Sequence, residues 1–112
     1  MKRVLILIHF AAKLTRDNMG PMGLKAASCV QANVENFAGI FSSDIAFGFA
    51  GVTNQDTSEL LKTLFKAIGL KPGDNVSVVE LAENISSTHP GLMEWQGATG
   101  FVASLARLAR ER

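Results

Sequence analysis

The segment 3–10, RVLILIHF, constrains the fold of this chain more than any other. Between Arg3 and Phe10 the side chains do not alternate between apolar and polar, as they would in a strand with one face in water. The run therefore predicts a β-strand that is buried on both faces. A sheet built around it needs a cover on each side, from the chain's own helices or from a second subunit.

Two helices are predicted in the middle of the chain. For the first, Asn18 or Gly20 is the expected N-cap, and Pro21 takes an early helical position where its missing N–H costs nothing. The second begins at Asp56, which forms a capping-box pattern with Glu59. The residues expected on the buried faces are Leu24, Ala27 and Val30 in the first helix and Leu61, Leu64, Phe65 and Ile68 in the second.

The rest of the chain predicts a turn, a strand and a last helix. Gly69 is placed to end the second helix, and residues 71–74, KPGD, are typical of a turn. The valines and leucine of 76–81 predict a strand, and the His89–Pro90 pair opens a terminal helix. The apolar face of that helix is expected to include Trp95, Phe101, Leu105 and Leu108.

The segment 34–41 leaves two architectures open. If it forms a hairpin with the strand predicted at 45–50, the chain is an α+β two-layer sandwich, ferredoxin-like βαββαβ with an added C-terminal helix. If the first helix instead continues to about residue 42, the chain becomes an α/β protein, with three βα units forming a small parallel sheet in a three-layer arrangement. We favour the hairpin because Asn, Gly and Phe in this segment are poor helix formers. In either case we expect residues 1–112 to form a single domain.

Composition argues against several classes of partner. The net charge is +1, so we expect neither nucleic acid nor an acidic membrane as a partner. No stretch approaches the roughly 20 apolar residues that span a bilayer, and we interpret the apolar start of the chain as a strand rather than a signal peptide. The single cysteine, Cys29, cannot form an internal disulfide or a multi-cysteine zinc site, so we expect a cytoplasmic protein.

Polar residues follow two of the predicted strands. In both architectures we take the first and third strands as parallel, so we expect their ends to meet at one edge of the sheet, beside the N-terminus of a helix. Basic side chains and unpaired helix N–H groups both favour negative charge, so this edge predicts a pocket for a small anionic ligand. The expected ligand-binding residues are Lys13, Arg16, Asn18, Thr53 and Asn54, and His9 is the candidate catalytic acid or base.

Acidic residues further along separate the two architectures. Glu80 and Glu83 would join His9 in the parallel sheet and would lie at the opposite edge in the ferredoxin-like one. We predict no metal site and no cofactor. The chain has no nucleophile elbow, phosphate loop or zinc-type spacing, so whether it is an enzyme stays open.

Two functions from different classes follow. The first is a small homo-oligomeric binding or assembly module, which would present apolar sheet or helix surface to copies of itself or to a partner. It is supported by the two-sided first strand and by the small residues Ala46, Gly48 and Ala50 on one face of the third strand. The alternative is a small-molecule enzyme or anionic-ligand sensor with its site at the His9 strand end. We prefer the first because it needs fewer assumptions.

Overall fold

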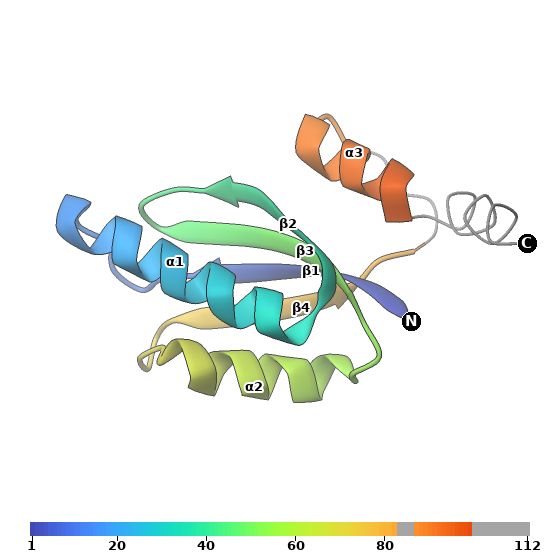
Figure 1. The fold of residues 1–112 in the computed structure, drawn as a ribbon. Helices are drawn as coiled ribbons and strands as arrows, with labels where there is room; N and C mark the ends of the chain where they lie inside the picture. Colours follow the sequence, from blue (N-terminus) through green and yellow to red (C-terminus); the bar gives the residue numbers. More distant parts are fainter. Residues whose placement is uncertain (83–86, 100–112) are drawn as a thin grey trace, which may run out of the picture.

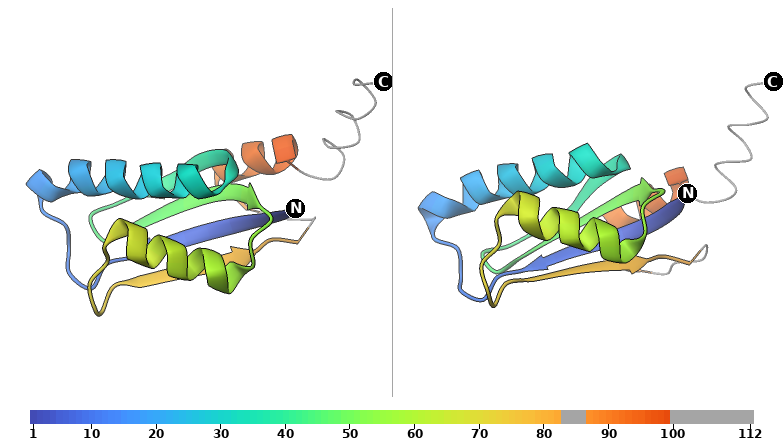
Figure 2. Two further views of the ribbon diagram at one scale, coloured as in Figure 1. Left: turned by 60° about the horizontal axis from the view of Figure 1, so that its bottom comes forward. Right: turned by 90° about the horizontal axis from the view of Figure 1, so that it is seen from below.

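The computed structural model describes residues 1–82 and 87–99 of the chain. The elements follow one another as β1 (Lys2–His9), α1 (Arg16–Asn33), β2 (Glu35–Ser42), β3 (Ala46–Thr53), α2 (Thr57–Ile68), β4 (Asn75–Glu80) and α3 (Pro90–Thr99). Figure 1 shows the strands as one sheet, with α1 and α2 side by side over one face and α3 beside β2. Figure 2 shows that the first turns of α1 extend beyond the ends of the strands.

The described residues form an α+β fold with a four-stranded antiparallel sheet and three helices. The strand order is β2-β3-β1-β4, and every neighbouring pair is antiparallel. The predicted hairpin at 34–50 is therefore confirmed, and the parallel sheet of three βα units is wrong. The chain leaves the helix at Val34, which is extended, and Asn36 then takes a φ of 51°. Asparagine tolerates this left-handed conformation, and the pairing of β2 with β3 is irregular after Glu35.

The two faces of β1 are covered to different degrees. Val4, Ile6 and Ile8 point toward the helices and are fully buried. Leu5 and Leu7 point to the opposite face and are only half-buried. The expectation of a strand buried on both faces is confirmed for the helix side and only in part for the other side.

The main core lies between the sheet and the two covering helices. Its aromatic residues come from the end of β1 and from β3, and Phe10 meets Phe47 edge to face with ring centroids 5.2 Å apart. Interlocked aromatic and aliphatic side chains of this kind fix how the helices sit on the sheet. The buried members of this core are Val4, Ile6, Ile8, Phe10, Ala26, Val30, Val34, Phe47, Phe49, Leu60, Leu64, Ile68 and Leu70.

The helix α2 forms where the sequence predicts it. Asp56 is its N-cap, and Gly69 ends it in the left-handed conformation, with φ 75° and ψ 40°. The capping-box interpretation is wrong in detail, since the Asp56 carboxylate accepts a hydrogen bond from the Ser58 hydroxyl and makes no side-chain cap. The buried stripe is Leu60, Leu64 and Ile68, while the predicted Leu61 and Phe65 are half-buried.

The helix α1 begins earlier than predicted. Thr15, not Asn18 or Gly20, is the N-cap, and its hydroxyl accepts a hydrogen bond from the Asn18 backbone N–H at 3.2 Å. Because Thr15 caps the helix about one turn before Asn18, the helix begins at Arg16. Pro21 therefore lies inside the helix and not in its first turn. Leu24, expected on the buried face, is 73% exposed, and the fully buried residues of α1 are Ala26 and Val30.

The helix α3 packs on the sheet face that α1 and α2 leave open. Trp95 is its one buried side chain within Pro90–Thr99, and the indole packs with Ala50 and Val52 of β3. The indole N–H donates to the carbonyl oxygen of Asn36 at 2.8 Å, which ties α3 to β2. Phe101, Leu105 and Leu108, the other predicted members of the terminal apolar face, lie outside the described residues. Across 1–82 and 87–99, no helix has the length and hydropathy needed to cross a membrane.

Candidate functional site

The antiparallel sheet separates two groups of residues that the sequence interpretation placed together. In the pairing of β1 with β3, Lys2 lies opposite Thr53 and His9 lies opposite Ala46. His9 and the Thr53–Asn54 pair therefore lie at opposite ends of the sheet, and the expected shared edge is wrong. The reason is topological. A helix returns β2 parallel to β1, and the tight hairpin then reverses the direction of β3.

His9 does not face the hollow next to it. It is exposed and lies on the outer sheet face between Ala46 of β3 and Asn75 of β4. Arg16 is also exposed, at the first turn of α1. The structure therefore brings His9 and Arg16 to the same end of the molecule without uniting them in one cavity. Their catalytic and ligand-binding roles stay predictions.

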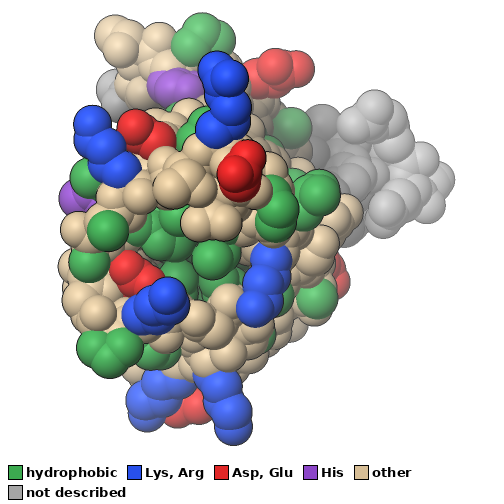
Figure 3. Space-filling view, turned by 90° about the vertical axis from the view of Figure 1, so that its left-hand side faces the viewer, with side chains coloured by type: hydrophobic (Ala, Val, Ile, Leu, Met, Phe, Trp, Pro, Cys, Tyr) green, Lys and Arg blue, Asp and Glu red, His purple; other side chains and the backbone are tan. Residues whose placement is uncertain are grey.

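A pocket of about 440 Å³ does lie at this end of the sheet, and two of the predicted ligand-binding residues, Lys13 and Asn18, line it. It lies between the first half of α1 and the turn that joins α2 to β4. Figure 3 looks onto this end and shows apolar side chains at the bottom of a hollow, with basic and acidic side chains around it. The apolar part comes from Phe10, Leu14 and Met22.

The turn at 71–74 forms one wall of this pocket, and Asp74 holds that turn in place. One carboxylate oxygen of Asp74 accepts the Lys71 backbone N–H at 3.0 Å, and the other accepts the Ala11 backbone N–H at 2.9 Å. Gly73 allows the turn because it takes a φ of 96°. Asp74 therefore connects the wall to the segment after β1, and both of its oxygens are engaged by backbone donors.

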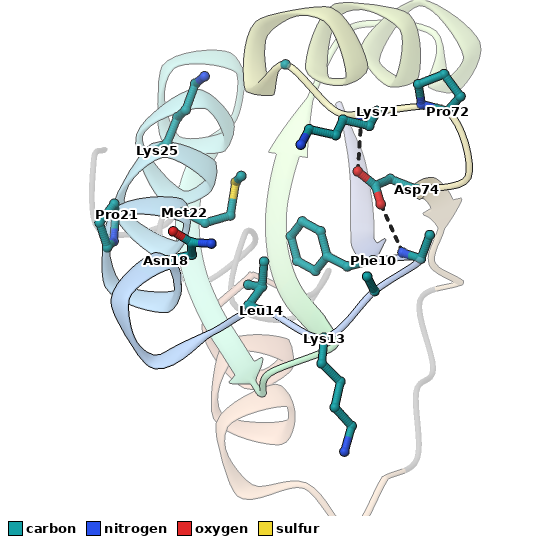
Figure 4. A pocket seen from close by; sticks show the side chains of 13 residues that line it. Phe10, Lys13, Leu14, Asn18, Pro21, Met22, Lys25, Lys71, Pro72 and Asp74 are labelled. Carbon is teal, nitrogen blue, oxygen red and sulfur yellow. Dashed lines mark hydrogen bonds between the residues drawn. The ribbon is translucent and has the colours of Figure 1, made fainter.

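The lysines of the pocket differ in where they point. In Figure 4, Lys13 extends away from the cavity, whereas Lys71 and the amide of Asn18 extend into it. The Lys25 ammonium lies close to Gly69, the C-cap of α2, and a Cβ at that position would be 3.3 Å from the Lys25 nitrogen. A cation at a helix C-terminus is favourable on its own account. Lys71 is thus the lysine that is aimed at the interior of the pocket.

The other two predicted ligand-binding residues line a separate hollow. Thr53 and Asn54 border a space of about 310 Å³ at the far end of the sheet, together with Glu35 and Gln55. Thr53 is buried, and its hydroxyl accepts the Gln55 backbone N–H at 3.0 Å. This hydroxyl serves the turn into α2, and the nearby carboxylate of Glu35 does not favour an anion.

A second surface of interest is the part of the outer sheet face that α3 leaves bare. We call it the outer patch, and define it as Leu5, Leu7, Phe41, Gly48 and Val79. Phe41 is 43% exposed and Val79 is 45% exposed. The ring of Phe41 lies directly over Gly48, where any side chain would overlap it. Gly48 therefore leaves room for an aromatic ring from the neighbouring strand β2.

The covered end of the outer face is polar as well as apolar. Arg3 is 7% exposed, and its guanidinium carbon lies 5.8 Å from the centroid of the Trp95 ring. It donates to the carbonyl oxygen of Ala82 at 2.6 Å and to the side chain of Gln96. The charged side chain of Arg3 therefore lies where α3 provides partners for it, whereas His9 at the other end of the same face is exposed.

The acidic residues that were to distinguish the architectures lie apart from His9. Glu80 pairs with Val4, five residues from His9 along β1, as the hairpin architecture requires. Glu83 lies outside the described residues. Within 1–82 and 87–99, no three His, Cys, Asp or Glu side chains gather in a way that could hold a metal ion.

Sequence reasoning found the pocket's end of the molecule but missed most of its lining. Met22, Lys71 and Asp74 were assigned to a helix and a turn with no functional role. The position of the 71–74 turn could have been predicted from the βαββαβ order. In that order β4 is antiparallel to β1, so it begins beside the end of β1 and brings the turn to that edge.

The chain matches no family model, no curated protein and no solved structure in the comparisons made. Its function therefore has to be argued from the geometry of its own surfaces.

Proposed function

We propose that this protein is a homo-oligomeric assembly module, in which the outer patches of two copies pack face to face. The observation that supports this is the cluster of partly exposed apolar side chains on β1, β2 and β4, with Gly48 of β3 between β2 and β1. Leu5 pairs with Val79, and Leu7 pairs with Gly48, over which Phe41 lies. Apolar residues on neighbouring strands form a continuous surface, and surfaces of this kind are typical of interfaces.

The charge of the outer patch favours a second copy over a different partner. Each of its five members is uncharged. In a dimer with a twofold axis the same surface meets itself, so every charge near the axis would face its like. A patch without ionised groups avoids that repulsion, whereas a partner recognised by charge would require complementary groups on this face. Two antiparallel sheets can pack in this way about 10 Å apart.

The arrangement of the elements supports a more specific fold as part of the same proposal. Three observations support a ferredoxin-like sandwich: the element order βαββαβ, the strand order β2-β3-β1-β4 and the two helices on one face. In such a sandwich the second sheet face has no helical layer of its own. We propose that α3 covers one end of it and a second subunit covers the rest, in a cytoplasmic setting that suits the unpaired Cys29.

The test is the oligomeric state of the full chain and of two matched variants. Val79→Lys places a charge in the outer patch at a position that is 45% exposed, and Leu24→Lys places the same charge on α1 at a position that is 73% exposed. Sedimentation velocity over a micromolar concentration series gives the dimer dissociation constant, and far-ultraviolet circular dichroism checks that each variant is folded.

We expect a dimer for the wild type and for Leu24→Lys, and a dissociation constant raised by at least about tenfold for Val79→Lys, because burying an unpaired ammonium is costly. A wild-type chain that stays monomeric over the whole series would overturn the proposal. So would a dimer that Leu24→Lys disrupts and Val79→Lys does not, because the interface would then lie on α1.

A further inference from the structure

We infer that the pocket at the end of β1 binds a small aromatic monocarboxylate, with Lys71 and Asn18 holding the carboxylate and the apolar wall holding the ring. This site is separate from the outer patch, because its lining comes from α1, the 71–74 turn and the segment after β1. The inference therefore does not depend on whether the protein is a dimer.

The size and composition of the pocket fit a small organic molecule rather than a simple ion. A volume of about 440 Å³ lies within the range of roughly 300–1,000 Å³ that is usual for ligand pockets. Phe10, Leu14 and Met22 supply an apolar surface, and Phe10 is 5% exposed because it is anchored in the main core. An inorganic anion would leave this surface in contact with water, whereas an organic body would cover it.

The residue types of the apolar lining favour an aromatic ring. Pro21 and Pro72 lie on opposite sides of the pocket, one on α1 and one on the turn (Figure 4). Both are rigid, and the Met22 thioether between the helix and the sheet is a favourable neighbour for an aromatic ring. An aromatic ring on the edge of Phe10 would also gain from the preference of aromatic pairs for edge-to-face contact.

The polar side of the pocket favours a carboxylate. Lys71 and Asn18 extend into the cavity from opposite walls, so an ammonium and an amide N–H₂ both line it (Figure 4). The only acidic side chain in the lining, Asp74, already accepts two backbone N–H groups. Among residues 1–82 and 87–99, no carboxylate lies within ion-pairing distance of the Lys71 ammonium. Lys71 can therefore pair with an anion without first breaking an internal bridge.

The experiment measures binding of 3-phenylpropionate to the full chain by two-dimensional amide NMR. Two further probes separate the parts of the ligand: 3-phenylpropionamide keeps the ring without the charge, and propionate keeps the charge without the ring. Lys71→Gln removes the proposed cation. Its matched control is Lys62→Gln on α2, where the lysine is 72% exposed and lies 3.8 Å from Glu59.

We expect saturable shifts for 3-phenylpropionate at residues 10–14, 18–25 and 69–74. Removing either half of the ligand, or the Lys71 charge, should weaken binding by about tenfold, the scale of one charge-assisted hydrogen bond or one buried ring. Lys62→Gln should bind as the wild type does. The inference is overturned if 3-phenylpropionate gives no saturable shifts, if the neutral amide binds equally well, or if Lys62→Gln weakens binding as much as Lys71→Gln.

The same spectra keep this result distinct from the assembly proposal. Shifts at the pocket can appear in a monomer or a dimer, and a change in line width with concentration reports association. Loss of binding in Lys71→Gln with unchanged association would concern only the pocket. Loss of association with unchanged binding would concern only the outer patch.

Discussion

The substitution Trp95→Ala tests how α3 is held on the sheet. Trp95 is 6% exposed and is the one buried side chain of Pro90–Thr99. Its indole packs on Ala50 and Val52, and its N–H donates to the Asn36 carbonyl oxygen at 2.8 Å. Because the main core under α1 and α2 has its own set of residues, we expect the substitution to release α3 and leave that core folded.

The magnitude follows from what the indole buries. A tryptophan side chain buries about 200 Å², and at about 25 cal/mol per Å² this corresponds to about 5 kcal/mol. The loss cannot exceed the free energy with which α3 is docked, because a helix that has left the sheet loses nothing more. Helices in proteins are stabilised mainly by tertiary packing, so α3 should unfold once it is released from the sheet. We expect the free energy of unfolding to fall by about 3 kcal/mol, near the lower end of values for a buried aromatic.

The assay is amide hydrogen exchange combined with urea denaturation. In Trp95→Ala the amides of α3 should lose their protection, while those of β1 and β3 keep most of theirs. The control is Leu64→Ala on α2, a fully buried residue of the main core. Leu64→Ala should lower the free energy of unfolding by about 3–5 kcal/mol. It should also lower the protection of amides throughout the sheet, without a selective effect on α3.

A uniform loss of protection in Trp95→Ala would refute this reasoning. It would mean that the small cluster around Trp95 and the main core unfold as one cooperative unit. A decrease in the free energy of unfolding of less than about 1 kcal/mol would also refute the reasoning, since the indole would then not be buried in solution.

Three further predictions concern residues that support the helices and strands around the pocket and the outer patch. In Gly51→Ala the new methyl group would overlap the side chain of Val34, and we expect the free energy of unfolding measured by urea denaturation to fall by about 2 kcal/mol. Thr15→Ala removes the N-cap of α1 and should cost about 1 kcal/mol. The hydrogen bond from Ser58 lowers the pKa of Asp56, so Ser58→Ala should raise that pKa toward its ordinary value in a carboxyl NMR titration. A lowered carboxyl pKa stabilises the fold at neutral pH, and this contribution is lost as the pH falls through that pKa.

Each of these has a control within the chain. Gly39→Ala meets no atom within 4 Å and should leave stability nearly unchanged, so an equal loss at Gly39 and Gly51 would contradict the steric argument. Thr63→Ala, an exposed position inside α2, should not destabilise the chain. For Ser58→Ala, the deficit in stability should be largest at neutral pH and shrink on acidification. A deficit independent of pH would exclude the carboxylate as its cause.

The local patterns of the sequence predicted most of the secondary structure. Gly69 ends α2 because a glycine after an amphipathic stripe permits the left-handed cap, and the 71–74 turn follows from its proline and glycine. Two errors have specific causes. Thr15 rather than Asn18 is the N-cap of α1, because the Thr15 hydroxyl comes earlier in the chain and allows the helix to begin one turn earlier. Asp56 bonded to a nearby serine because short polar side chains compete with the backbone for partners.

The candidate site was predicted less well, because it depends on strand direction. His9 and Thr53 were both correctly placed near strand ends, but the direction of β3 decides which end of the sheet each one joins. Periodicity predicts which residues are in strands and says nothing about the direction in which the strands pair. Lys71 was missed although the favoured βαββαβ order makes β4 antiparallel to β1, because Lys71 is far from Asn18 in sequence and only that pairing brings the 71–74 turn to the pocket.

The alternation along β1 is the final argument for a partner on the outer face. Its even-numbered residues, Val4, Ile6 and Ile8, fill the main core, and its odd-numbered residues form the other face. On that face Arg3 lies under α3, where a carbonyl and a side-chain amide satisfy it, and Leu5 and Leu7 follow where α3 no longer reaches. His9, the last residue of this face, is exposed and polar, so the apolar surface of β1 that lacks a cover is limited to Leu5 and Leu7. These two half-buried leucines are the part of β1 that gains most from an apolar cover, and the identical patch of a second copy supplies one.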